Sequence, residues 1–121
     1  MYSTITTKKD SLASIKHDVM RSKKIGNNTF EVIYKDGKRA IRLHTTDIIT
    51  FIGGRYVLNT NGWETITTKD RINKYIPHGY VYQHNFIWYV RTESEGDIEY
   101  YDNMMFDQDG RHMPHIPTGN L

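Results

Sequence analysis

Hydroxyl groups, two cations and a tryptophan gather within the stretch LNTNGWETITTKDRINKY, residues 58–75, around a predicted helix start. The first turn of a helix presents backbone N–H groups without partners and a partial positive charge, so it stabilises an anion placed there. Lys69 and Arg71 oppose the helix dipole unless an anion lies between them. The spacing therefore predicts a site for phosphate or nucleic acid formed by five residues, Thr67, Thr68, Lys69, Arg71 and Trp63.

The same stretch also fits a purely structural joint between a sheet and a helix. In that interpretation Thr67 caps the helix and Asp70 pairs with Lys74 on the next turn. Trp63 then fills the core, and its replacement by alanine would cost about 3 to 5 kcal/mol. The sequence leaves the anion site and the joint as alternatives.

His44 and Asp47 lie close in sequence and have the side chains of an acid–base pair. A histidine that is hydrogen-bonded within the sheet is the alternative. No serine or cysteine nucleophile with local support accompanies the pair, and nucleophilic catalysis needs one. We predict no catalytic residue and no enzyme.

The stretch DQDGRHMPHI near the C-terminus has the donor types of a metal site, in Asp107, Asp109, His112 and His115. Its first residues resemble part of a calcium loop, but the later glutamate that completes such a loop is missing. We expect no bound metal and no cofactor.

Charge is distributed unevenly along the chain. Residues 1–24 contain six Lys or Arg and two acids, whereas residues 93–109 contain seven acids and no Lys or Arg. Such asymmetry steers charged partners. The acidic segment predicts an interface with a basic protein, formed by Glu95, Glu99 and Asp102.

A second aromatic stretch, YVYQHNFIWYVR at 80–91, alternates rings with polar residues. Rings and cations on a sheet are typical of single-strand nucleic-acid binding. Core packing explains most of the same rings, and a net charge of +2 is too small to favour nucleic acid.

The length of 121 residues is that of one ordinary domain, and we predict that residues 1–121 form a single domain. There is no cysteine among the 121 residues, which excludes disulfides and thiolate chemistry. No apolar run reaches the roughly 18 residues of a membrane span, and Met1 is not followed by the apolar stretch of a signal peptide.

Hydrophobic spacing predicts the elements that position these residues. Leu12, Ile15 and Val19 recur at helical spacing, so we expect an N-terminal helix at 10–22. A second helix is expected at 67–76, with Thr67 or Thr68 as its N-cap and Pro77 at its end. Strands are expected at 29–34, 39–44, 47–52, 55–59, 80–84, 87–92 and 97–102, with hairpin turns at 36–37, 53–54 and 84–85.

The predicted fold class is α+β, with an antiparallel β-sheet of about six to seven short strands, an N-terminal helix and a short helix near 67–76. The β-rich core spans 28–106. The tail at 107–121 lacks a periodic apolar pattern and is expected to be irregular.

Several stretches together are characteristic: IGNNTFEV at 25–32, IRLHTTDIITF at 41–51, LNTNGWETITTKDRINKY at 58–75 and YVYQHNFIWYV at 80–90. They resemble a small accessory protein family of tailed bacteriophages that has no assigned activity. The resemblance implies a phage protein that acts in the host bacterial cytoplasm.

Small phage proteins of this type often bind and disable a host component. The resemblance and the lack of a catalytic motif therefore favour a non-enzymatic binding protein whose partner is a host defence or regulatory protein. The alternative is a nucleic-acid or nucleotide-phosphate binding protein that uses residues 63–71. No membrane partner is expected.

Overall fold

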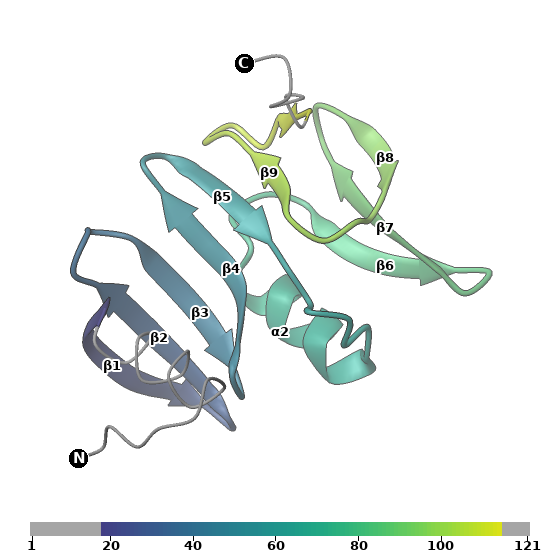
Figure 1. Ribbon diagram of the computed structural model, residues 1–121. Coiled ribbons are helices and arrows are strands. Elements are labelled where there is room, and N and C mark those ends of the chain that lie inside the picture. Colours follow the sequence, from purple (N-terminus) through teal and green to yellow (C-terminus); the bar gives the residue numbers. More distant parts are fainter. Residues whose placement is uncertain (1–17, 115–121) are drawn as a thin grey trace.

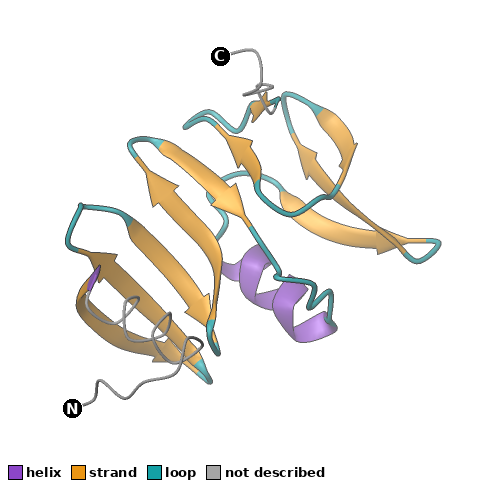
Figure 2. Ribbon diagram, viewed as in Figure 1, coloured by secondary structure: helices purple, strands orange, loops and turns teal. Residues whose placement is uncertain are grey.

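The computed structural model describes residues 18–114, which form ten strands in two antiparallel sheets and one helix, α2 (Figures 1 and 2). The helix covers Ile66–Tyr75. The strands are β1 (Val19–Gly26), β2 (Thr29–Tyr34), β3 (Arg39–Leu43), β4 (Thr46–Ile52), β5 (Arg55–Leu58), β6 (Tyr80–His84), β7 (Ile87–Thr92), β8 (Gly96–Glu99), β9 (Met104–Phe106) and β10 (His112–Met113).

The larger sheet has seven strands in the order β1-β2-β3-β4-β5-β9-β10, and the smaller one has three in the order β6-β7-β8. β1 to β5 form a meander joined by short turns. After α2 the chain builds the small sheet and then returns, so that β9 pairs with β5. Helix α2 lies where the two sheets approach each other (Figure 1).

One hydrophobic cluster joins the two sheets and the helix. Ile72 of α2 is fully buried, and it belongs to the same cluster as Ile49 of the large sheet and Val90 of the small one. Tyr56 and Phe106 stack within it at 5.3 Å between ring centroids. Asn73 ties α2 to β6, because its side chain accepts from Val81 N at 2.6 Å and donates to Val81 O at 2.9 Å.

A β-bulge in β4 changes which side chains face the core. Strict alternation would place Ile48 and Ile49 on opposite faces of the sheet. The register between β3 and β4 shifts after Ile41, which opposes Ile49, so that Arg42 opposes Asp47. Ile48 and Ile49 are consequently both buried.

The predicted α+β class with antiparallel strands is confirmed at a coarse level. The prediction of one sheet is wrong, because β6, β7 and β8 form a sheet of their own. The short helix is confirmed within one residue at each end. Ile76 adopts an extended conformation with ψ 133°, as expected for the residue before Pro77.

The predicted N-terminal helix is wrong at its C-terminal end. Residues 10–17 lie outside the described residues, but residues 19–22 belong to β1. The reason is the turn at Asn27–Asn28, where Asn28 has a φ of 52°. It is a hairpin turn that pairs β1 with β2, so the residues before it form a strand.

The segments near the C-terminus also differ from the expectation. The strand predicted at 97–102 ends at Glu99, and Met104–Phe106 forms the separate strand β9. The tail predicted as irregular contains β10, which pairs with β9; residues 115–121 lie outside the described part. The helix found within 18–114 is too short and too polar to cross a membrane.

Candidate functional site

The start of α2 is capped by Thr65, two residues before the predicted cap Thr67. Thr65 has φ −111° and ψ 164°, and its hydroxyl accepts from Thr68 N at 3.1 Å. The hydroxyls of Thr65 and Thr68 also lie 3.1 Å apart, so Thr68 is buried within the cap. Thr67 is exposed in the first turn. The prediction that Thr67 or Thr68 caps the helix is therefore wrong.

The two predicted cations do not converge on the helix start. Lys69 Nζ lies 5.8 Å from the centroid of the Trp88 ring. Arg71 Nε donates to Thr29 Oγ1 at 2.9 Å, and its Nη2 donates to the carbonyl of Asn27 at 3.4 Å. Arg71 thus holds the β1–β2 turn against the helix. Of the predicted anion-binding residues, the structure brings Trp63, Thr67 and Thr68 together and places both cations elsewhere.

Trp63 does not fill the core, because 64% of its surface is exposed. The buried tryptophan is Trp88, which packs against Tyr100. Among the ion pairs of residues 18–114, none joins Asp70 to Lys74, and Lys74 lies over the ring of Tyr75 instead. The structural joint that we predicted is therefore wrong in three details: the residue that caps the helix, the tryptophan that fills the core and the ion pair between Asp70 and Lys74.

A pocket of about 480 Å³ opens between the β3–β4 turn and the start of α2, and we call it the threonine pocket. Trp63, His44, Leu43 and Ile48 contribute to its walls. Six threonines complete them, namely Thr45, Thr46, Thr60, Thr65, Thr67 and Thr68.

The threonine pocket unites two stretches that are separate in sequence. IRLHTTDI supplies the side around His44, and LNTNGWETITT supplies the side around Trp63. Sequence reasoning missed the contribution of His44, Thr45 and Thr46. The density of threonines in both stretches was the available signal, but only the fold shows that they face each other.

Asp102 holds the turn that carries Trp63. Its carboxylate accepts from Thr60 N at 2.8 Å, from the Thr60 hydroxyl at 2.9 Å and from the Tyr100 hydroxyl at 2.5 Å. Burial disfavours the charged form, but the hydrogen bonds from Tyr100 and Thr60 outweigh it and lower the pKa of Asp102. Burial, and then the hydrogen bond to Asp102, raise the pKa of Tyr100.

His44 and Asp47 do not form an acid–base pair. His44 lies exposed in the β3–β4 turn with a φ of 56°, and its backbone N–H donates to Asn28 O at 2.8 Å. Asp47 accepts instead from Arg42 Nε at 2.7 Å and from the Tyr34 hydroxyl. The expectation of a histidine hydrogen-bonded within the sheet is also wrong, because His44 is a turn residue.

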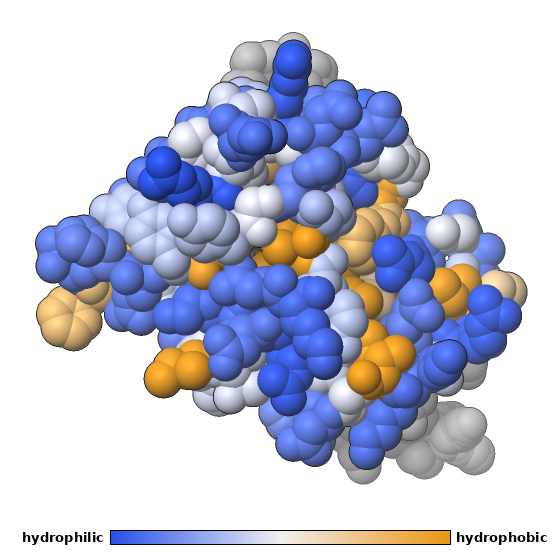
Figure 3. Space-filling model, turned by 180° about the vertical axis from the view of Figure 1, so that it is seen from behind, coloured by the Kyte–Doolittle hydropathy of each residue, from blue (hydrophilic) through white to orange (hydrophobic). Residues whose placement is uncertain are grey.

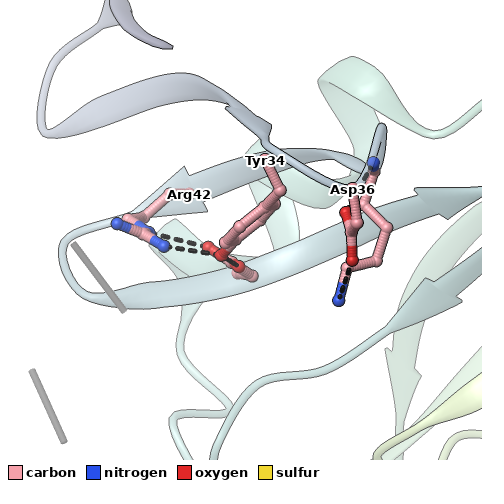
Figure 4. A network of polar contacts seen from close by, with 5 residues as sticks. Tyr34, Asp36 and Arg42 are labelled. Atoms are coloured by element: carbon pink, nitrogen blue, oxygen red, sulfur yellow. Dashed lines mark hydrogen bonds and ion pairs between the residues drawn. The ribbon is translucent and has the colours of Figure 1, made fainter. Parts of the chain in front are cut away.

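Tyr34, Arg42 and Asp47 form a closed polar network beside the threonine pocket (Figure 4). Arg42 Nη2 donates to the Tyr34 hydroxyl at 2.7 Å. Burial, followed by the hydrogen bond to Asp47, raises the pKa of Tyr34 to about 12. The hydroxyl therefore stays protonated at neutral pH and acts as a donor, which makes this network a structural brace.

The residues considered for a metal site have structural roles as far as they are described. Asp107 accepts from the backbone N–H of Asp109 at 2.9 Å and of Arg111 at 3.0 Å. His112 Nε2 lies 2.8 Å from the Tyr101 hydroxyl. Within residues 18–114 no three His, Asp or Glu side chains form a group suited to a metal; His115 lies outside that range.

The acidic residues predicted for an interface fall into two kinds. Glu95 and Glu99 are exposed, at the β7–β8 turn and on β8, whereas Asp102 is committed to the turn at 60–62. Glu99 opposes Tyr89 across the β7–β8 pairing. Glu99 and its neighbours lie on one side of the small sheet, and we call this surface the tyrosine face. It consists of Tyr80, Tyr82, Tyr89, Arg91, Asp97 and Glu99.

A protein-family model described as Kyanoviridae Gp96 protein matches residues 5–108. The chain belongs to this family of phage proteins. The match covers the whole threonine pocket and the whole tyrosine face. No curated protein and no solved structure matches the chain.

Membership in the Gp96 family confirms the predicted phage origin and assigns no activity. The surface of this family member is mainly hydrophilic on the side shown in Figure 3, with apolar groups in a strip near the centre and as isolated projections. Exposed large apolar side chains of residues 18–114 include Trp63, Ile66 and Phe86. Apolar exposure on the side shown in Figure 3 is therefore confined to small areas.

Proposed function

We propose that this phage protein is a non-enzymatic binding protein that acts in the host bacterial cytoplasm by occupying and inhibiting a host defence or regulatory protein. The observation that carries the proposal is the tyrosine face, an aromatic sheet surface with acidic residues on one side. We propose that this face binds a positively charged surface of the host protein.

The rings of the tyrosine face form a continuous ladder. The centroids of Tyr80 and Tyr82 lie 5.8 Å apart, and those of Tyr82 and Tyr89 lie 5.5 Å apart in a stacked arrangement. Tyr80 is 47% exposed, and Tyr82 and Tyr89 are half-buried by one another. Tyrosine supplies a large contact area at low entropic cost, and it is enriched at the energetic centres of protein interfaces.

The charges beside the ladder favour a basic partner. Arg91 and Asp97 lie 3.4 Å apart and largely neutralise each other. Glu99, next to Tyr89, and Glu95, in the following turn, leave a surplus of negative charge. An arginine or lysine of the partner gains from both the ring faces and the carboxylates. We therefore assign Glu95 and Glu99, without Asp102, to the proposed interface.

The test is capture of the partner from host lysate, with and without nuclease, followed by association kinetics. The double variant Glu95→Lys and Glu99→Lys should slow association and reduce its salt dependence, because electrostatic steering acts mainly on the on-rate. The matched control is Glu64→Lys with Asp70→Lys, which changes the net charge equally at exposed positions outside the face. Equal slowing by both variants would show that overall charge, and not the tyrosine face, guides binding.

The alternative function, nucleic-acid or nucleotide-phosphate binding through residues 63–71, has weaker geometric support. Arg71 is engaged with Thr29 and Asn27, and Lys69 lies against Trp88. A captured complex that disappears after nuclease treatment would favour this alternative over a protein partner.

A further inference from the structure

The threonine pocket has the size and concavity of a small-molecule site. Its volume of about 480 Å³ lies within the range of roughly 300 to 1,000 Å³ that is usual for ligand pockets. It lies away from the tyrosine face, on the side of α2 that meets the β3–β4 turn. A ligand here would add a second function, independent of the proposed protein interface.

The walls of the pocket contain no Lys, Arg, Asp or Glu side chain. A charged group buried there would lose hydration without gaining an opposite charge. The cap of α2 is also occupied, since Thr65 already binds the backbone N–H of Thr68. These features select an uncharged ligand.

The hydroxyls of the walls select a ligand with hydrogen-bonding groups of both kinds. A threonine hydroxyl can donate one hydrogen bond and accept two, and an imidazole can donate or accept. The hydroxyl of Thr60 is used on Asp102 and Gly62, and those of Thr65 and Thr68 bond each other. Thr67 and Thr45 are exposed at the pocket and keep their hydroxyls accessible. A planar heterocycle, with acceptor nitrogens, carbonyls and amino groups around its edge, matches such walls.

Trp63 provides the flat surface for such a ring. Its indole is part of the pocket wall although most of it is exposed to solvent. The turn that carries it is rigid, because Trp63 N donates to Thr60 O at 2.9 Å and Thr60 is held by Asp102. Because the backbone of this turn is held in place, a ligand that stacks on Trp63 has to order its side chain alone.

The geometry points to the threonine pocket as a binding site for a nucleobase or nucleoside, with the base stacked on Trp63 and its polar edge on the threonine hydroxyls. The uncharged base and sugar occupy the pocket, and no phosphate contact contributes.

In the experiment, the full-length protein is titrated with the common ribonucleosides and deoxyribonucleosides. Binding is measured by calorimetry and by tryptophan fluorescence. At least one nucleoside should bind and quench Trp63. Trp63→Ala should raise the dissociation constant about tenfold or more, as expected when a stacking partner is lost. Phe86→Ala, which removes an exposed aromatic ring outside the pocket, should leave it unchanged.

A second variant makes the result independent of folding. Thr67→Val keeps the volume of an exposed side chain and removes only its hydroxyl, so it should weaken binding while circular dichroism stays that of the parent. Three results would overturn the inference: no nucleoside binding at the solubility limit, equal binding by the Trp63→Ala variant, or binding of monosaccharides in place of nucleosides. A nucleoside monophosphate that binds more than tenfold tighter than its nucleoside would move the site to the anion class.

Discussion

Trp63 and Trp88 are the two tryptophans of the chain, and they lie in opposite environments. Trp88 is 4% exposed and belongs to the core, whereas Trp63 is 64% exposed beside a pocket. The sequence shows that Trp63 follows an Asn-Gly turn, but the direction of its ring depends on how Asp102 holds that turn from 40 residues away. The turn before Trp63 was therefore predictable from the sequence. The environment of each tryptophan was not, because it depends on contacts between residues that are distant in sequence.

Trp63→Ala should change the free energy of unfolding by less than about 1 kcal/mol, because surface substitutions have small effects. Trp88→Ala, in contrast, should cost about 3 to 5 kcal/mol through loss of a buried ring. Urea unfolding followed by circular dichroism measures both. A comparable loss for the two variants would mean that Trp63 packs against the core after all.

Asp102→Asn should destabilise the protein by about 1 to 3 kcal/mol at neutral pH, because charge-assisted hydrogen bonds to Thr60 and Tyr100 are weakened. The folded pKa of Asp102 is lowered, so its contribution is fully present above the unfolded value of about 3.9. It is lost as the pH falls through the lower folded value.

The difference in stability between parent and Asp102→Asn should therefore be constant from about pH 6 to about pH 8, and should shrink below about pH 4. Urea midpoints measured across this range provide the test. A difference that does not change with acidification would remove the carboxylate charge from the explanation.

At the scale of elements, the hairpin turns were largely predictable from the sequence, but the residue that caps α2 was not. Strands β2 to β7 follow from alternating residues and from turns at Asp36-Gly37 and Gly53-Gly54, whereas the β6–β7 turn lies at Asn85-Phe86, one residue later than predicted. The start of α2 offers three threonines within four residues, Thr65, Thr67 and Thr68, and each can cap a helix. The extended backbone of Thr65 decides among them, and sequence does not reveal it.

Thr65→Ala should cost about 1 kcal/mol because the cap hydrogen bond to Thr68 N is lost. Thr67→Ala is the matched control, with the same chemical change two residues later at an exposed position, and it should have little effect. Thermal unfolding of both variants separates them. The larger loss for Thr67→Ala would restore the cap that we predicted from the sequence.

The β6–β7 turn contains a strained residue that sequence reasoning did not identify. Asn85 and Phe86 have φ values of 51° and 67°, as a two-residue hairpin turn requires, but glycine is the preferred second residue. Phe86→Gly should raise stability by about 0.5 to 1 kcal/mol, since relief of the left-handed conformation exceeds the added entropy of the unfolded chain. Phe86→Ala keeps the Cβ atom and should gain nothing, which isolates the backbone effect in thermal unfolding.

At the scale of the whole molecule, the long-range pairings were beyond the sequence. β9 is only three residues long, and nothing in its pattern indicates that it pairs with β5 across the helix and the small sheet. The split into two sheets has the same origin, because β6 pairs only within its own hairpin while Asn73 and Ile72 join it to the rest. Local patterns identified most strands, and the shared core determines how they assemble.

The shared core makes a prediction about cooperativity that bears on the single-domain expectation. Ile72 is fully buried where α2 meets both sheets, so Ile72→Ala should cost about 2 to 5 kcal/mol. If the two sheets form one cooperative unit, this loss lowers the stability of both together. A Trp63→Phe background leaves Trp88 as the single tryptophan, whose fluorescence reports on the small sheet.

Circular dichroism, in contrast, reports on all strands, and most of them belong to the large sheet. We expect the two signals to give the same urea midpoint in the Trp63→Phe protein, and to shift to the same lower midpoint when Ile72→Ala is added. Val90→Ala, at a fully buried position of the small sheet, should act in the same way. Separate midpoints for fluorescence and circular dichroism would show that the small sheet unfolds independently, so that the tyrosine face and the threonine pocket would belong to different folding units.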